Sequence, residues 1–124
     1  DDIYTEEMTQ KTYDRLLELG VLLASQGWSV ILDAKYDQQD LRKAVIAQAQ
    51  KHHLPLQIVY CDAPMAVLRD RVTHRAGDIS DATANLLAQQ QANADPFNER
   101  EKAYLVTIDT TQDWDQLSET LAKL

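Results

Sequence analysis

Residues 27–33, with the sequence GWSVILD, place a carboxylate directly after a short apolar run. An apolar run bounded by glycine and an acid predicts a strand that is buried on both faces, as in a parallel sheet. In an open α/β sheet, ligands bind beyond the carboxyl ends of the strands. We therefore expect Asp33 to end a strand over residues 29–34, at the edge where such folds bind ligands.

A second candidate group is basic, because Arg69, Arg71 and Arg75 fall within seven positions of an otherwise acidic chain. Arg71 and Arg75 are four residues apart, so on a helix they share one face and can grip one anion. Guanidinium forks suit phosphate. The alternative is a solvated helix face on which neighbouring acids form surface ion pairs. The position favours phosphate, since this helix follows the second predicted strand, on the edge expected for Asp33.

Alternating helices and strands are predicted to position these residues. The predicted strands are 29–34, 56–61 and 104–108, and helices are expected to begin near Thr5, Asp37, Pro64, Ser80 and Trp114. The order α-β-α-β-α-α-β-α implies parallel pairing with right-handed crossovers. The three strands are expected to end at Asp33, Asp62 and Asp109, so one sheet edge is anionic and suits a ligand that carries Mg²⁺.

The composition fits a single globular domain of 124 residues, with 44% hydrophobic and 26% charged residues. The net charge of −8 argues against a broad nucleic-acid-binding face. No apolar run is long enough to span a membrane, and no signal-peptide pattern is present. The single cysteine, Cys61, is expected to be a buried thiol in a cytoplasmic protein. Because the sequence begins with Asp1 rather than Met, we expect it to be a piece of a longer protein.

The run that ends in Asp33, the CDAP sequence at 61–64, the pair Arg71 and Arg75, and the DISDA sequence at 78–82 together resemble small P-loop kinases. This group contains gluconate-kinase-like, polynucleotide-kinase-like and zeta-toxin-like proteins. The resemblance is greatest to AAA-family ATP-binding domains of the type fused to aminoglycoside-phosphotransferase-like domains, and it covers nearly the whole chain. It implies a parallel-sheet, three-layer α/β sandwich of the P-loop NTPase type.

The resemblance also implies roles for individual residues. Asp33 would be a Walker-B-like carboxylate, near the phosphoryl acceptor or near Mg²⁺ through a water molecule. Arg71 and Arg75 would be lid arginines that fold over the nucleotide phosphates. Lys35 and Arg42 would lie on the acceptor side. Relatives commonly have Thr at the position of Lys35, and this lysine would neutralise acceptor charge or pair with Asp33.

The phosphate loop of such kinases is absent from this sequence. The loop requires Gly-x-x-x-x-Gly-Lys-Ser/Thr, and none of the three glycines is followed by Lys. In the resembled family, the strand before that loop lies at the centre of the sheet, between the predicted strands 29–34 and 56–61. We therefore expect residues 1–124 to be the C-terminal two-thirds of a kinase domain, with three strands and a missing central strand. ATP and Mg²⁺ would be cofactors of the full-length protein, and neither is expected to bind tightly to this chain.

A missing central strand would leave two strands with unpaired backbone groups. Either the flanking strands close up on each other, or a second copy completes the sheet and forms a homodimer. Two functions remain open at this point. The first is an inactive fragment of an ATP-dependent kinase or NTPase that acts on an unknown small-molecule acceptor. The second is a nucleotide-independent α/β module for binding or dimerisation.

Overall fold

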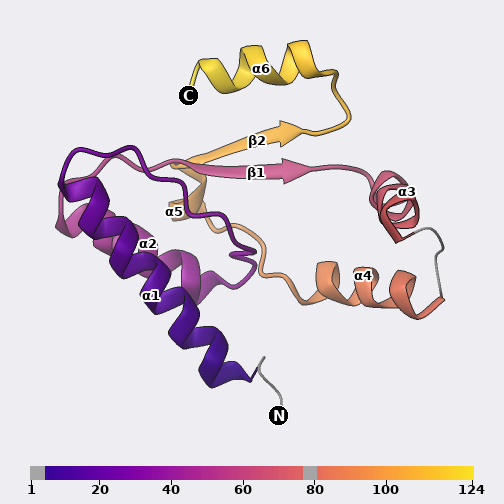
Figure 1. Cartoon of the computed structure of the whole chain (residues 1–124), viewed down its shortest axis with the longest axis horizontal. Helices are drawn as coiled ribbons and strands as arrows, with labels where there is room; N and C mark the ends of the chain where they lie inside the picture. The colour runs from indigo at the N-terminus through magenta and orange to yellow at the C-terminus, as the bar shows by residue number, and fades with distance from the viewer. Residues whose placement is uncertain (1–4, 77–80) are drawn as a thin grey trace. The chain divides into compact units, whose positions relative to one another are not determined.

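The computed structural model describes residues 5–76 and 81–124, and the chain divides into two compact units, residues 1–56 and residues 57–124. The first unit contains helices α1 (Glu6–Ser25) and α2 (Gln39–Lys51), which pack against each other (Figure 1). In order, the second unit contains β1 (Ile58–Asp62), α3 (Met65–Ala76), α4 (Asp81–Asn93), α5 (Glu99–Lys102), β2 (Leu105–Asp109) and α6 (Trp114–Ala122). That residues 1–124 form a single domain stays a prediction.

Helix α1 begins where the sequence predicted. The Thr5 hydroxyl accepts a hydrogen bond of 3.1 Å from the backbone N–H of Met8, which satisfies one of the unpaired donors of the first turn. Glu6 and Glu7 follow in that turn, where the helix dipole favours negative charge. A local signal therefore fixes this helix start.

Both helices of the first unit end in the same hydrogen-bonding pattern. Gly27 and Trp28 donate their backbone N–H groups to carbonyls three and five residues earlier, over 3.0 and 3.2 Å. His53 and Leu54 repeat this arrangement after α2, over 3.2 and 2.8 Å. This is the Schellman motif, which needs a left-handed residue after the helix. Gly27 supplies it with a φ of 93°, and His53 does so with a φ of 55°.

The first predicted strand is wrong, since residues 29–34 form no strand and the described sheet has two strands rather than three. The segment still alternates, because Val30 and Leu32 are half-buried whereas Ile31 is 90% exposed. Leu32 lies against α1 at Gly20, where an added Cβ would be only 2.8 Å from Leu32 Cδ2. Side-chain packing on the helix therefore holds a segment that lacks a strand partner.

The second and third predicted strands are confirmed as β1 and β2, each moved by one or two residues toward the C-terminus. They pair in parallel from Ile58 opposite Leu105 to Asp62 opposite Asp109, side by side in Figure 1. Two of the three predicted strand-end acids, Asp62 and Asp109, therefore lie together at one edge. Beyond that edge, the Thr110 N–H donates to the Asp62 carbonyl over 2.9 Å, and α6 packs against β2.

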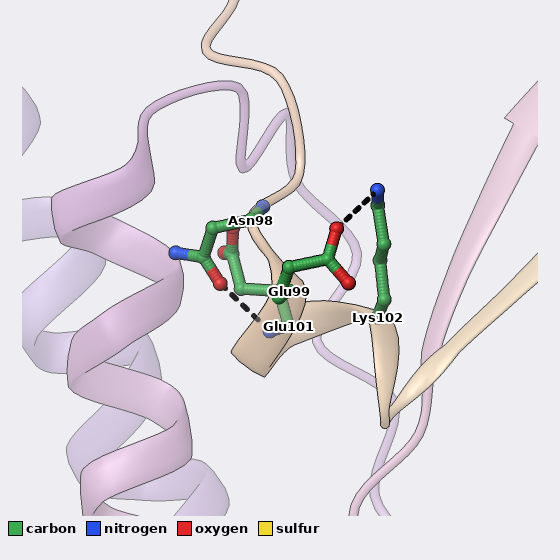
Figure 2. A network of polar contacts seen from close by, with 4 residues as sticks. All are labelled: Asn98, Glu99, Glu101 and Lys102. Atoms are coloured by element: carbon green, nitrogen blue, oxygen red, sulfur yellow. Dashed lines mark hydrogen bonds and ion pairs between the residues drawn. The ribbon is translucent and has the colours of Figure 1, made fainter.

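Helix α5 was not predicted from the sequence. The Asn98 side chain accepts from the Glu101 N–H over 2.8 Å, and the Glu101 carboxylate accepts from the Asn98 N–H over 3.0 Å (Figure 2). This reciprocal capping box stabilises a single turn. Lys102 pairs with Glu99 over 2.9 Å on its exposed side, while Glu101 is only 2% exposed. The short helix thus owes its start to local side-chain bonds.

Three further expectations concern the N-cap of α2, the thiol of Cys61 and the cap at Ser80. The N-cap of α2 is Gln38, which makes no side-chain capping bond, so the expectation of Asp37 was one residue early. Cys61 is exposed, so the expected buried thiol is wrong, and the strand β1 is exposed from Val59 to Asp62. The expected cap at Ser80 lies outside the described residues.

Of the helices in residues 5–76 and 81–124, none has the length and apolarity needed to cross a bilayer.

The contact between Gly20 and Leu32 predicts a coupling between two substitutions. Gly20→Ala should stabilise the chain by less than the usual gain of alanine over glycine in a helix, because Leu32 must move away from the new Cβ. In a Leu32→Ala background the same change should give the full gain of up to about 1 kcal/mol. Urea unfolding of the two single variants and the double variant measures this coupling. An equal effect of Gly20→Ala in both backgrounds would show that the contact does not form.

Candidate functional site

The candidate functional residues are divided between the two units. Asp33, Lys35 and Arg42 belong to the first unit, and Arg71 and Arg75 belong to the second. Asp33 is exposed and follows the extended segment that lies on α1. A single site that joins Asp33 to the two arginines therefore stays a prediction, and the geometry of each group stands by itself.

Lys35 forms an ion pair with Asp37. Its Nζ lies 3.9 Å from Asp37 Oδ2, and the lysine side chain is 58% exposed. Such exposed pairs contribute about 1 kcal/mol or less and are screened by salt. The sequence had suggested that Lys35 pairs with Asp33 or meets acceptor charge; the structure gives it Asp37 as a partner.

The loop after Asp33 is held at Tyr36. This tyrosine has a φ of 45°, in the left-handed region that bulky residues seldom adopt. Its carbonyl accepts a hydrogen bond of 2.9 Å from Arg42 Nη1, and its N–H donates to the Tyr13 hydroxyl over 3.4 Å. The two tyrosine rings meet edge to face, with centroids 5.0 Å apart. Residues of both helices therefore hold the backbone of this residue.

Burial is pronounced around this turn. Arg42 is only 3% exposed although it carries a full charge. Burial, followed by the neighbouring Tyr13, raises the pKa of the Tyr36 hydroxyl, so this group is neutral at physiological pH. Within the described residues, that hydroxyl is buried without a hydrogen-bond partner. The resemblance placed Arg42 on the acceptor side, and the structure adds that its guanidinium reaches the main chain of the loop after Asp33.

In the second unit, Arg71 lies at the carboxyl edge of the parallel strands. Its guanidinium donates twice to Thr110, over 2.8 Å to Oγ1 and over 2.7 Å to the carbonyl. The Thr110 hydroxyl in turn donates to the Asp62 carbonyl over 3.1 Å. These bonds tie α3 to the ends of both strands. Arg75 lies one turn later on α3, and its side chain is outside the described part of the chain.

The carboxylate at the end of β2 stays ionised. Thr111 donates to Asp109 Oδ1 from its hydroxyl over 2.6 Å and from its N–H over 2.9 Å. These two bonds, helped by the charge of Arg71, hold the pKa of Asp109 below its usual range. Sequence reasoning did not single out Thr110 or Thr111 as site residues. The available signal was the Asp-Thr-Thr run after a strand, because such side chains bond to nearby backbone in turns.

The resemblance implies ATP and Mg²⁺ as cofactors of the full-length protein. Among the described residues, no group of three or more His, Cys, Asp or Glu side chains is placed to hold a metal ion. Asp33 is exposed and would supply one carboxylate, through a water molecule as the resemblance implies. The sequence also lacks the phosphate loop that would hold the nucleotide. That this chain needs further residues to bind nucleotide stays a prediction.

The hydrogen bond from the Thr111 hydroxyl leads to a prediction about the pKa of Asp109. Thr111→Val removes that donor, so the pKa of Asp109 should rise toward its usual value. In the parent chain the depressed pKa contributes stability above the ordinary aspartate pKa, and this contribution is lost as the pH falls through the lower, native pKa. Carboxyl NMR titration measures the shift, with Thr107→Val on β2 as the control. Identical Asp109 titrations in all three chains would contradict the assignment.

The chain is similar to mycobacterial proteins and to a family model. Over 96 residues, 75% of this chain, it is 33% identical to the uncharacterized protein Rv2004c of Mycobacterium tuberculosis (strain ATCC 25618 / H37Rv) and to the uncharacterized protein Mb2027c of Mycobacterium bovis. The matched region spans 19% of each relative's length. No solved structure matches the chain. A family model described as an AAA domain matches residues 1–97, and the chain therefore belongs to this family of P-loop kinase-like AAA domains.

Proposed function

We propose that this chain is the C-terminal part of an ATP-dependent P-loop kinase or NTPase domain. Asp33 is the Walker-B-like carboxylate, and Arg71 and Arg75 are the lid arginines over the nucleotide phosphates. The observation that carries the proposal is Arg71, which lies at the carboxyl edge of two parallel strands in a chain of this family. Ligands of open α/β sheets bind at that edge.

The contacts of Arg71 support a phosphate-binding role. Its two hydrogen bonds to Thr110 orient the planar guanidinium while its side chain stays exposed. Both acceptors are neutral oxygens, whereas a phosphate carries negative charge and can accept two parallel bonds from the guanidinium fork. A nucleotide phosphate can therefore compete with Thr110 for Arg71. Without nucleotide, Thr110 keeps the guanidinium at the strand ends.

The exposure of residues 29–34 in the first unit supports the proposal that the sheet of this domain lacks a strand. Residues 29–34 have a strand-like alternation without a strand partner, and Ile31 is 90% exposed. A central strand followed by a phosphate loop, supplied by the longer protein, would pair with this segment and fix Asp33. The relatives are long enough to contain it, because the matched region spans only 19% of their length. In that protein, ATP and Mg²⁺ are the cofactors and a cytoplasmic small molecule is the acceptor.

We further place the domain in the group of gluconate-kinase-like, polynucleotide-kinase-like and zeta-toxin-like kinases, of the type fused to aminoglycoside-phosphotransferase-like domains. Lys35 and Arg42 then belong to the acceptor side. The exposed ammonium of Lys35, held only by Asp37, suits an acceptor that carries negative charge.

A second candidate function is an α/β binding or dimerisation module that needs no nucleotide. The observation that favours it is β1, on which Val59 and Tyr60 are 42% and 41% exposed although parallel strands are usually covered on both faces. A second copy that pairs with β1 would form a homodimer. Sedimentation and calorimetry of the longer protein separate the two, since a dimer that lacks nucleotide affinity even with a phosphate loop present favours the module.

The kinase proposal predicts a loss of phosphoryl transfer in Asp33→Asn. The 124-residue chain should not bind Mg²⁺–ATP at micromolar concentrations, whereas the longer protein with a phosphate loop should bind it and transfer phosphate. Asp33→Asn should lower kcat by about 10²- to 10³-fold, the usual effect of removing one preorganised electrostatic contact. Calorimetry measures the binding, and release of labelled phosphate or its transfer measures turnover.

Asp40→Asn is the matched control, because Asp40 is another exposed acid a few residues further along the same unit. It should leave kcat within about twofold. Equal activity of Asp33→Asn and Asp40→Asn would overturn the role of Asp33. Micromolar binding of Mg²⁺–ATP by the 124-residue chain would overturn the expectation that it lacks its nucleotide cradle.

A further inference from the structure

The turn at Tyr36 is a strained feature three residues after the candidate acid. A φ of 45° brings the Cβ of a non-glycine residue close to its own carbonyl oxygen. Such outliers persist only where the surrounding structure imposes them, and they gather at functional sites. The chain could relieve the strain with glycine or asparagine, and it has tyrosine there instead. The neighbouring contacts must therefore hold the turn.

Arg42 is the strongest of these contacts. Its Nη1 donates to the Tyr36 carbonyl over 2.9 Å from the second turn of α2, and the residue is 3% exposed. Burial of a guanidinium is costly unless its donors are used. An arginine that is buried to this degree cannot swing out to an acceptor without breaking its bond to the loop. Its neighbour Lys43 is exposed and has no such restraint.

The opposite side of the turn is held by α1. The Tyr36 N–H points to the Tyr13 hydroxyl over 3.4 Å, and the rings stack edge to face at 76°. The bond to Arg42 and the bond to Tyr13 thus use both backbone polar groups of one residue. Two packed helices therefore fix the path of the chain where it leaves Lys35.

We propose that Arg42 is a positioning residue that acts through the Tyr36 carbonyl to hold the loop carrying Asp33 and Lys35. Its effect on phosphoryl transfer rests on the function proposed above, whereas the restraint on the loop can be measured without it. Arg42 touches neither acceptor nor nucleotide in this role. It sets the direction in which Asp33 and Lys35 face the acceptor.

The first test measures hydrogen exchange of the loop amides in the 124-residue chain. Arg42→Gln should speed exchange at residues 34–38 by about tenfold or more, since a hydrogen bond from a charged donor is lost. Arg42→Lys keeps a charged donor and should restore part of the protection. Lys43→Gln removes the adjacent charge without touching the loop and should change nothing. Tyr36→Phe should also leave exchange unchanged, because the hydroxyl that it removes has no partner among the described residues.

Amides of α1 and α2 provide the internal reference. If Arg42→Gln speeds exchange equally at the amides of α1 and α2, the substitution has unfolded the unit. The exchange rates of Arg42→Lys then test the proposal. Faster exchange in Arg42→Lys that is confined to residues 34–38 supports the proposal. Unchanged loop exchange in a folded Arg42→Gln or Arg42→Lys variant overturns it.

The second test measures turnover in the longer protein with a phosphate loop. A positioning role predicts that Arg42→Gln lowers kcat while KM for ATP stays within about twofold, with partial rescue by Arg42→Lys. A rise in KM for the acceptor without a change in loop exchange would show direct substrate contact and overturn the proposal. If Asp33→Asn abolishes transfer but Arg42→Gln leaves kcat intact, the kinase function stands and the inference fails. If Asp33→Asn has no effect, the proposed function fails, and hydrogen exchange alone decides whether Arg42 holds the loop.

Discussion

Backbone pairing between β1 and β2 is the interaction on which the second unit depends. Five residues of each strand pair in parallel register, and the turn after β2 continues the hydrogen bonding through Thr110. Residues 29–34 have a similar apolar composition, yet they form no strand. A strand exists only where a neighbour satisfies its backbone donors and acceptors. The difference between β1 and residues 29–34 is therefore a difference in partners, because both segments have the residues of a buried strand.

The same constraint explains how much of the fold the sequence could predict. The start of α1 at Thr5 was predicted because the groups that bond there lie three residues apart. Strand formation depends on residues far away in the sequence. The pairing of Ile58 with Leu105 required a connection of three helices, of which the short α5 was not predicted. Local signals thus fixed helix ends, while the number of strands depended on distant partners.

Part of the candidate site could likewise be predicted from the sequence, and part depends on distant residues. The order of elements placed Arg71 on a helix after a strand, but its bonds to Thr110 join residues 39 positions apart and follow from no local pattern. Lys35 was expected near Asp33 or an acceptor, and its partner Asp37 depends on the turn at Tyr36. Residue types and approximate places could be read from the sequence. The hydrogen bonds that orient them could not, because they depend on tertiary packing and on one unusual φ.

The turn at Tyr36 shows how a loop can hold a candidate acid when its strand is not paired. Left-handed backbone at a residue with a side chain costs about 1–2 kcal/mol. A hydrogen bond from a charged donor contributes about 1.5–3 kcal/mol, so the bond from Arg42 is large enough to offset that strain. Leu32 anchors the other side of Asp33 on α1 at Gly20. The chain on both sides of Asp33 is therefore fixed by helices, and a neighbouring strand would add precision to an acid whose approximate position these contacts already set.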